Sequence, residues 1–290
     1  MTKKCLTLAL HGGAGAIPDR GYEREIAFML GLAEEKRDRL RGGASALDVA
    51  AETVADLEAC GLFVAGRGSS ANSAGRFELD ACLMDGPTRR AGAVAALEGF
   101  KSPIAAARAV MEMTPHVMLV GDGAAMLARE AGLAAIPGDD WFTPVRRRPA
   151  ATPEGLAHGT VGCVVRDGDG ALAAATSTGG VFGKRLGRVG DAPIPGCGTW
   201  ADDLVAVSCT GYGEYFIRAS AASQLAHRLR FGRADLRTAA HAVLADVRAL
   251  GGDGGLIAVT ADGQVVTPYN SRGMNRAVVH ADGSVVAEVF

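Results

Sequence analysis

Four short motifs between His158 and Glu214 hold the residues of this 290-residue chain best suited to chemistry. They are His158-Gly159-Thr160-Val161-Gly162, Thr176-Ser177-Thr178-Gly179-Gly180, Gly187-Arg188-Val189-Gly190-Asp191 and Ser208-Cys209-Thr210-Gly211-Tyr212-Gly213-Glu214. A threonine hydroxyl can attack a carbonyl group once a neighbouring group accepts its proton. Thr160 precedes an apolar run typical of a strand, and Gly159 lacks a side chain, so the peptide bond between them can reach a strained geometry. Cleavage of that bond would free the α-amino group of Thr160 to act as its base.

The other three motifs predict the remaining parts of an active site. Thr178 offers a second hydroxyl group that would hold the first in place. The glycines around Thr210 leave backbone N–H groups unshielded, as an oxyanion hole requires. Arg188 and Asp191 form a bipolar pair. A guanidinium binds a carboxylate and an aspartate binds an ammonium group, so this pair is suited to the α-amino acid end of a substrate.

Taken together, the motifs resemble those of the plant-type L-asparaginase and isoaspartyl peptidase family of N-terminal nucleophile hydrolases. The resemblance covers nearly the whole chain and includes residues 8–15, 77–81, 92–95, 254–258 and 270–274. It implies an α+β fold of the αββα sandwich type, with two stacked sheets between helical layers. It also implies a precursor that is cut into an α subunit, residues 1–159, and a β subunit, residues 160–290, which together form one domain.

The resemblance also implies residue roles. Thr160 would be the nucleophile, with cleavage after Gly159, and Thr178 its hydroxyl partner. Thr210 and Gly211 would form the oxyanion hole, and Arg188 and Asp191 would anchor the substrate beside Gly211 and Gly213. No organic cofactor is expected, but the family binds a sodium ion through main-chain carbonyl groups, here those of Leu57, Glu58, Cys60, Phe63, Ala65 and Arg67. A dimer of processed αβ units is expected.

Two residues depart from the family pattern. Val64 stands where asparagine is usual, so a polar contact near the nucleophile is lost. Tyr212 stands where a smaller residue is usual and would line the leaving-group side of the pocket. Asp202 and Asp203 either lie near that rim or are solvated turn carboxylates. His11, beside a glycine pair, is expected to be a buried support for the Thr160 loop, and His158 an incidental residue of the linker.

Composition excludes several classes of function. The net charge is −2 and 48% of the residues are hydrophobic, so the chain lacks the basic footprint of a nucleic-acid-binding protein. No uncharged apolar run reaches the roughly 18 residues that a membrane-spanning helix needs. The six cysteines include no C-x-x-C pair, which argues against zinc. Without a secretion signal they indicate reduced thiols and a cytoplasmic protein.

Periodicity and turn residues predict the elements that position the motifs. Helices are expected over residues 23–41, 45–57, 103–113, 123–131, 214–231 and 236–250. Strands are expected over residues 6–10, 116–120, 161–166, 171–177, 204–209, 256–260 and 264–268, with hairpins within 77–97 and around Asp282-Gly283. Residues 138–157 hold three prolines and an arginine triplet, so they are expected to form a flexible linker before the cleavage site.

The preferred hypothesis is therefore an autoproteolytic amidohydrolase that cleaves β-aspartyl dipeptides and L-asparagine. Two alternatives stay open. One is a relative specialised for another β-aspartyl amide, such as the asparagine-linked sugar or β-aspartyl-arginine. The other is an unprocessed binding protein that keeps the amino-acid pocket but never frees its nucleophile.

Overall fold

The computed structural model describes residues 6–143 and 159–290. Its strands are β1 Thr7–Ala14, β2 Leu79–Asp85, β3 Ala91–Leu97, β4 Met118–Val120, β5 Val161–Arg166, β6 Leu172–Thr178, β7 Thr199–Ala201, β8 Val205–Gly211, β9 Gly254–Thr260, β10 Val265–Val266, β11 Met274–Val279 and β12 Val285–Glu288. Its α-helices are α1 Glu23–Arg41, α2 Ala46–Ala59, α3 Pro103–Met113, α4 Asp122–Glu130, α5 Gly213–Ala219, α6 Ala221–Arg230 and α7 Leu236–Ala249. Short 3₁₀ helices cover Gly66–Gly68 and Asp139–Trp141.

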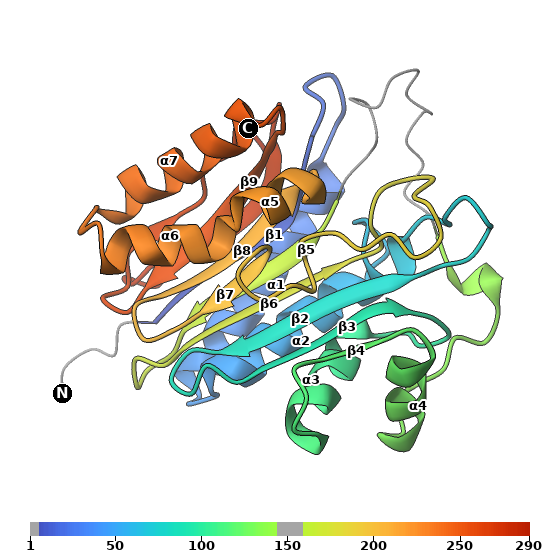
Figure 1. The fold of residues 1–290 in the computed structure, drawn as a ribbon. Helices are drawn as coiled ribbons and strands as arrows, with labels where there is room; N and C mark the ends of the chain where they lie inside the picture. Colours follow the sequence, from blue (N-terminus) through green and yellow to red (C-terminus); the bar gives the residue numbers. More distant parts are fainter. Residues whose placement is uncertain (1–5, 144–158) are drawn as a thin grey trace.

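Two sheets organise these elements (Figure 1). Within the described ranges the larger sheet has the strand order β12-β11-β1-β5-β6-β2-β3-β4 and the smaller one β10-β9-β8-β7. The strand pairs are antiparallel except β3 with β4. The long central strands β1, β5, β6 and β2 are almost wholly buried, which explains why they read as continuous apolar runs.

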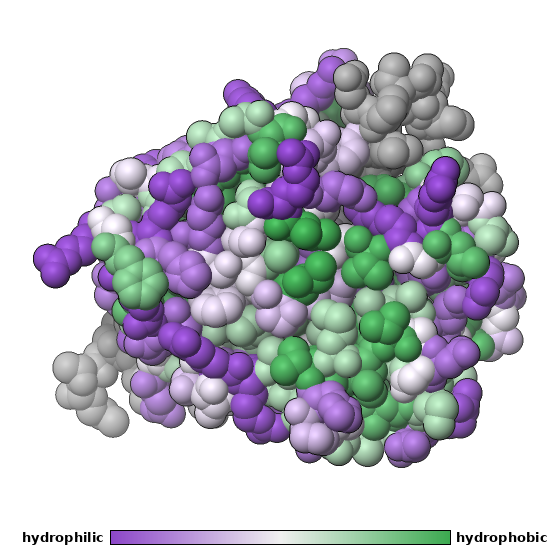
Figure 2. Space-filling view, viewed as in Figure 1, coloured by the Kyte–Doolittle hydropathy of each residue, from purple (hydrophilic) through white to green (hydrophobic). Residues whose placement is uncertain are grey.

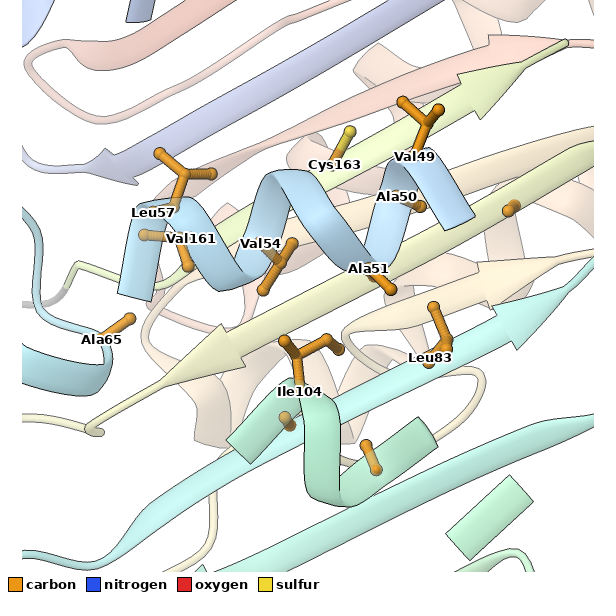
Figure 3. Close-up of a cluster of buried hydrophobic side chains, with 14 of the residues drawn as sticks. Val49, Ala50, Ala51, Val54, Leu57, Ala65, Leu83, Ile104, Val161 and Cys163 are labelled. Atoms are coloured by element: carbon orange, nitrogen blue, oxygen red, sulfur yellow. The ribbon is translucent and has the colours of Figure 1, made fainter. Parts of the chain in front are cut away.

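Helices α1 to α4 pack against one face of the larger sheet. Helix α2 begins at Ser45, whose hydroxyl accepts the N–H of Asp48 at 3.1 Å, as the capping pattern predicts. Its apolar side chains, including Val54 and Leu57, lie over Val161 of β5 (Figure 3). Burial of this stripe fixes the strand that follows Thr160.

The other face of the larger sheet packs against the smaller sheet. Ala9 and Val164 of the larger sheet share a buried cluster with Ala206 and Ile257 of the smaller one. On its far side the smaller sheet is covered by α5, α6 and α7, with Phe216 fully buried among them. The expected α+β class with two sheets is confirmed.

Most expected elements are confirmed to within a few residues, including the hairpin at residues 167–170 and the last hairpin around residues 282–283. Some expectations were wrong. The helix expected over 214–231 is two helices, because Ser220 adopts the left-handed conformation at φ 47°. The strand expected over 116–120 covers Met118–Val120 alone, and β7 was not expected.

The expected linker is ordered at its start. Residues 139–141 form a 3₁₀ turn, and Phe142 is buried with its ring stacked on Phe77 at a centroid distance of 3.7 Å. Thr143 N–H then donates to the carbonyl of Arg67 at 2.8 Å. Aromatic stacking therefore overrides the proline-rich composition as far as residue 143. Residues 144–157 of the expected linker, and His158, lie outside the described residues.

Among the helices of the described residues, none is long and apolar enough to cross a membrane.

Candidate active site

Antiparallel pairing brings the two key threonines together. Strands β5 and β6 pair with Val161 opposite Ser177, so Thr160 and Thr178 are the next positions along the same register. The Thr160 hydroxyl donates to the Thr178 hydroxyl at 3.2 Å. Thr178 in turn accepts the N–H of Gly180 at 2.9 Å. Both side chains are almost fully buried, which limits the positions open to the Thr160 oxygen.

Gly159 lies in a space that admits no side chain. A Cβ atom there would come within 2.8 Å of the Val64 side chain. From the other side Gly13, at φ 103°, approaches so closely that its own Cβ atom would lie 2.6 Å from the Cα atom of Gly159. The glycine pair beside His11 therefore packs against the expected cleavage site, and Val64 forms the opposite wall.

His11 supports Thr160 rather than acting on its hydroxyl group. Its Nδ1 atom lies 3.0 Å from the carbonyl oxygen of Thr160, and its Nε2 atom 3.0 Å from the Ser208 hydroxyl. Burial lowers the pKa of His11 to about 3, so the ring is neutral near pH 7. Since a carbonyl can only accept, the neutral ring donates from Nδ1 and accepts from Ser208. The structure thus places His11 as the sequence predicts.

A chain of buried hydroxyl groups continues from Ser208. Thr176 lies 2.7 Å from Ser208, and the Thr199 hydroxyl lies 2.6 Å from that of Thr176 and 3.0 Å from the Ala192 carbonyl oxygen. This chain joins strands of both sheets and ends beside Asp191. Sequence reasoning missed its members, because a threonine in an apolar strand is usually a packing residue. The sequence held only a weak signal for them, namely that hydroxyl groups at fully buried strand positions need hydrogen-bond partners.

The Thr210 motif lies at the end of strand β8 and contacts strand β1. The Thr210 hydroxyl accepts the N–H of Ala14 at 3.1 Å, which ties β8 to the glycine-rich end of β1. Gly211 has φ 156°, and a Cβ atom there would lie 2.4 Å from the Asp253 carbonyl oxygen. Only glycine fits this position.

The two predicted substrate anchors lie on one loop but differ in their partners. Arg188, with 14% of its side chain exposed, makes a bidentate pair with the exposed Glu214, with both N–O distances 2.9 Å. Asp191 is buried, and its Oδ2 atom has no hydrogen-bond partner among the described residues. Burial raises the pKa of Asp191 to about 7, against the opposing effects of its own backbone N–H and the charge of Arg188.

Gly213 permits the burial of Asp191. A Cβ atom at residue 213 would lie 2.9 Å from both the backbone nitrogen and Oδ1 of Asp191. Glu214, which sequence reasoning did not assign, follows directly and holds Arg188. The sequence did hold a signal for this pairing, because the predicted loop arginine needs a carboxylate partner when no substrate is bound.

A framework of buried charges lies behind this loop and was also missed. Lys184, 4% exposed, donates to the main-chain carbonyl of Glu78 at 2.8 Å. The Glu78 carboxylate accepts the N–H of Gly187 at 2.9 Å and the amide of Asn72 at 2.8 Å. These bonds fix the loop that begins at Gly179 and carries Arg188.

The expected sodium loop follows helix α2. The carbonyl groups of Leu57, Phe63, Ala65 and Arg67 accept one hydrogen bond each, from Cys60 Sγ, Ala65 N–H, Gly68 N–H and Thr143 N–H. Each carbonyl retains a second lone pair. Gly66, at φ 50°, approaches so closely that a Cβ atom there would lie 2.6 Å from the carbonyl oxygen of Glu58, so both ends of the loop converge. The negative end of the α2 dipole also favours a cation, so this set of oxygen atoms fits one.

Three residues bear on the pocket rim expected from the sequence: Asp202, Asp203 and Tyr212. Asp202 and Asp203 pair with Arg230, and Asp202 also accepts the N–H groups of Leu204 and Val205. The carbonyl oxygen of Asp202 lies beside Gly86 and Leu172, at the end of β6 opposite Thr178. The alternative that placed Asp202 and Asp203 near the pocket rim was therefore wrong. Tyr212 immediately precedes α5 and makes an edge contact with Tyr215, with ring centroids 6.3 Å apart.

A deeply buried hydroxyl pair beside a glycine, next to a loop that offers a guanidinium and a buried carboxylate, defines a site suited to acyl transfer from an amino-acid substrate. Comparison with known proteins agrees with this class. The family model described as asparaginase matches residues 4–152 and 144–288. The chain therefore belongs to the asparaginase family.

Similar curated proteins span nearly the same length. The chain is 44% identical to an isoaspartyl peptidase of Salmonella typhimurium, covering 98% of each chain. It is 44% identical to a plant-type L-asparaginase of Pyrobaculum calidifontis, over 93% of this chain and 95% of that one. It is 36% identical to an isoaspartyl peptidase/L-asparaginase of Danio rerio, over 93% and 91%.

Proposed function

We propose that this chain is an autoproteolytic amidohydrolase of the N-terminal nucleophile type, which cleaves β-aspartyl dipeptides and L-asparagine. The observation that carries the proposal is the Thr160–Thr178 hydroxyl pair, buried directly after a glycine that has no room for a side chain. The names of the similar proteins support the substrate class. A cytoplasmic location agrees with the free thiols of Cys60, Cys82, Cys163, Cys197 and Cys209.

The first step is cleavage of the chain itself. The Thr160 hydroxyl attacks the Gly159 carbonyl, the peptide C–N bond breaks as its nitrogen takes up the proton, and the Gly159 acyl group passes to the Thr160 oxygen as an ester. Water then hydrolyses this ester, which leaves a carboxylate at Gly159 and a free hydroxyl and α-amino group at Thr160. Thr178 accepts the Thr160 hydroxyl proton in a hydrogen bond, while His11 holds the Thr160 carbonyl from the other side. The neutral state of His11 favours this positional role over that of a base. The products are an α subunit of residues 1–159 and a β subunit of residues 160–290.

The second step is hydrolysis of the substrate. The α-amino group of Thr160 accepts the hydroxyl proton and returns it to the leaving amine. Backbone N–H groups at Thr210 and Gly211 stabilise the tetrahedral oxyanion. Water then releases aspartate from the acyl-enzyme.

Substrate recognition depends on Arg188 and Asp191. The Oδ2 atom of Asp191 is a buried acceptor without a partner, and such an atom is costly unless a ligand supplies the donor. A substrate ammonium group would supply it. The substrate carboxylate would exchange with Glu214 for the two N–H groups of Arg188, since Glu214 is exposed and loses little on release.

We also propose a structural sodium ion at residues 57–67. The carbonyl groups of Leu57, Glu58, Cys60, Phe63, Ala65 and Arg67 would hold it, and no catalytic step depends on it. Its effect would be to stiffen the loop that carries Val64, the wall of the cleavage site.

A dimer of processed αβ units is proposed as the assembly. Large apolar side chains are exposed on α3, α4 and the segment between them, namely those of Met113, Val117, Val120 and Met126. Figure 2 shows apolar residues gathered over this part of the molecule. Strand β4 is also a free sheet edge there, and a second copy would cover both features.

The deciding experiment is intact-mass measurement of the purified protein together with its Thr160→Ala variant. We expect two fragments from the first, with Thr160 as the new N-terminus, and one chain from the variant. Two fragments from Thr160→Ala, or a different N-terminus, would refute the proposal. A single unprocessed wild-type chain that still binds aspartate would instead support the binding protein. Side-by-side assays with the asparagine-linked sugar and β-aspartyl-arginine test the specialised relative.

A further inference from the structure

A cleft lies at the free edge of the smaller sheet, away from the catalytic threonines. It has a volume of about 400 Å³ and lies between α7, β10 and β11. Strand β10 contains two residues and pairs only with β9, so the chain leaves the sheet at Thr267 and opens the space. Pockets for small ligands begin at about 300 Å³, so this cleft can hold one. We name it the edge cleft.

Side chains with N–H donor groups line the edge cleft, namely those of one arginine and two histidines. Arg237 and His241 stand four residues apart on α7 and therefore share a helix face. His280 follows β11 and shares a strand face with Val278, because alternate residues point the same way. Among the residues that the structure describes, neither an aspartate nor a glutamate lines the cleft.

These three side chains have no internal partners. Among residues 6–143 and 159–290, neither an ion pair nor a side-chain hydrogen bond occupies Arg237, His241 or His280. On the neighbouring helix α6, by contrast, Arg228 pairs with Asp246 and Arg230 with Asp202. The N–H donors at the edge cleft are therefore available to a ligand.

The floor of the edge cleft is apolar. Val265, Val266, Pro268 and Val278 line it, and Tyr269 adds an aromatic ring. A ligand that satisfies both the floor and the rim combines an apolar body with a negative group. An inorganic anion would contact only the arginine and histidine side chains at the rim.

We propose that the edge cleft binds a small organic anion, whose carboxylate or phosphate contacts Arg237, His241 and His280 while an apolar ring lies on β10 and Val278. The site is separate from the catalytic one. Strand β9 lies between them, because Gly255 pairs with Thr210 on one side and with Tyr269 on the other. The proposal does not depend on the proposed function.

The test is isothermal titration calorimetry of the purified protein with three probes of similar size: benzoate, phenyl phosphate and neutral benzyl alcohol. We expect at least one anion to bind and the alcohol not to bind. The double variant Arg237→Gln/His280→Gln should weaken anion binding about ten-fold or more, because charged hydrogen bonds are lost. The control Arg129→Gln removes one arginine from exposed α4, away from the edge cleft, and should leave the affinity unchanged.

A second arm separates the edge cleft from the catalytic site. Anion binding should persist in Arg188→Gln, which alters the catalytic loop alone. Binding of benzoate or of phenyl phosphate identifies the preferred group, and either result supports the edge cleft. Equal affinities in wild type and in the double variant, equal binding of benzyl alcohol, or loss of binding in Arg188→Gln would each overturn the proposal.

Discussion

At the scale of single residues, the site combines two groups of residues. One group is held rigidly by internal hydrogen bonds, and the other has partners that a substrate could replace. Thr160, Thr178 and His11 are held by hydrogen bonds of 3.0–3.2 Å in a buried setting. Arg188 is held by an exposed carboxylate, and Asp191 has an unpaired oxygen. The rigidly held group is therefore suited to bond chemistry, and the other group to the arrival and departure of an amino acid.

Replacement of Arg188 by alanine should abolish aspartate binding but leave processing intact. The guanidinium meets the substrate carboxylate and does not touch the bond between Gly159 and Thr160. Loss of one partner of a buried charge pair costs roughly 2–5 kcal/mol, a large effect on the inhibition constant of aspartate. Arg185→Ala, exposed on the same loop, is the control. Unchanged inhibition in processed Arg188→Ala enzyme would contradict the anchor role.

Aspartate affinity should rise with pH through about 7. Burial raises the pKa of Asp191 to about 7, so the carboxyl group is partly neutral below that pH and must ionise to pair with the substrate ammonium. Titration of the processed enzyme between pH 6 and 8 measures this. In Asp191→Asn the affinity should be weak and lose this dependence. The same pH dependence in both proteins would rule Asp191 out as its source.

At the scale of elements, glycines and one histidine set the distance between β1, β5 and the loop after α2. The ring of Phe63 occupies the space beside Gly12, and Gly13 lies against Gly159. Such close backbone approaches exclude side chains, so these positions determine whether the cleavage site forms at all.

Gly159→Ala should prevent processing through steric conflict with Val64. The added Cβ atom would lie 2.8 Å from the Val64 side chain and displace the peptide bond from Thr160. The double variant Val64→Ala/Gly159→Ala should therefore regain part of the processing rate, followed by mass spectrometry over time. Failure of Val64→Ala to relieve the block would argue against the steric explanation.

His11→Gln should reduce the acid sensitivity of the fold. The pKa of His11 falls from 6.5 to about 3 on folding because burial disfavours its charge, so the unfolded chain binds more protons between these values. Wild-type stability is lost as pH falls through this window, by about 1.4 kcal/mol for each pKa unit. The difference in unfolding free energy between wild type and His11→Gln should accordingly shrink from pH 6.5 to 3. Exposed His116→Gln provides the control, and a constant difference for His11→Gln would disprove the linkage.

At the scale of the whole molecule, catalysis requires both sheets and both halves of the chain. The larger sheet supplies Thr160 and Thr178, while the smaller sheet ends in Thr210 and Gly211. The buried chain of hydroxyl groups from His11 to Thr199 crosses between the sheets. The proposed processing would cut the chain before Thr160, and these non-covalent contacts would then hold the two subunits together.

β-Aspartyl dipeptides should be hydrolysed with a higher kcat/KM than L-asparagine. Both substrates present the same aspartyl half, but a dipeptide adds a leaving residue that we expect Tyr212, in edge contact with Tyr215, to line. Binding energy from a remote group can be realised in the transition state, and ammonia offers none. Because Asp202 and Asp203 pair with Arg230 elsewhere, β-aspartyl-leucine and β-aspartyl-arginine should differ little. Preference for asparagine under identical conditions would instead indicate chiefly an asparaginase.

The sequence by itself predicted Thr160 as a hydroxyl nucleophile and Arg188 and Asp191 as loop anchors, and it determined the strand pairing that joins Thr160 to Thr178. These are local properties, because the turn at residues 167–170 sets the register of two adjacent strands. Tertiary structure alone decided the contacts of Val64 with Gly159, of Glu214 with Arg188 and of Asp202 with Arg230. It also decided that Phe142 has a fixed position, because this depends on stacking against the ring of Phe77, 65 positions earlier in the chain. Such contacts join segments distant in the chain, and no local pattern of residues specifies which buried surfaces will meet.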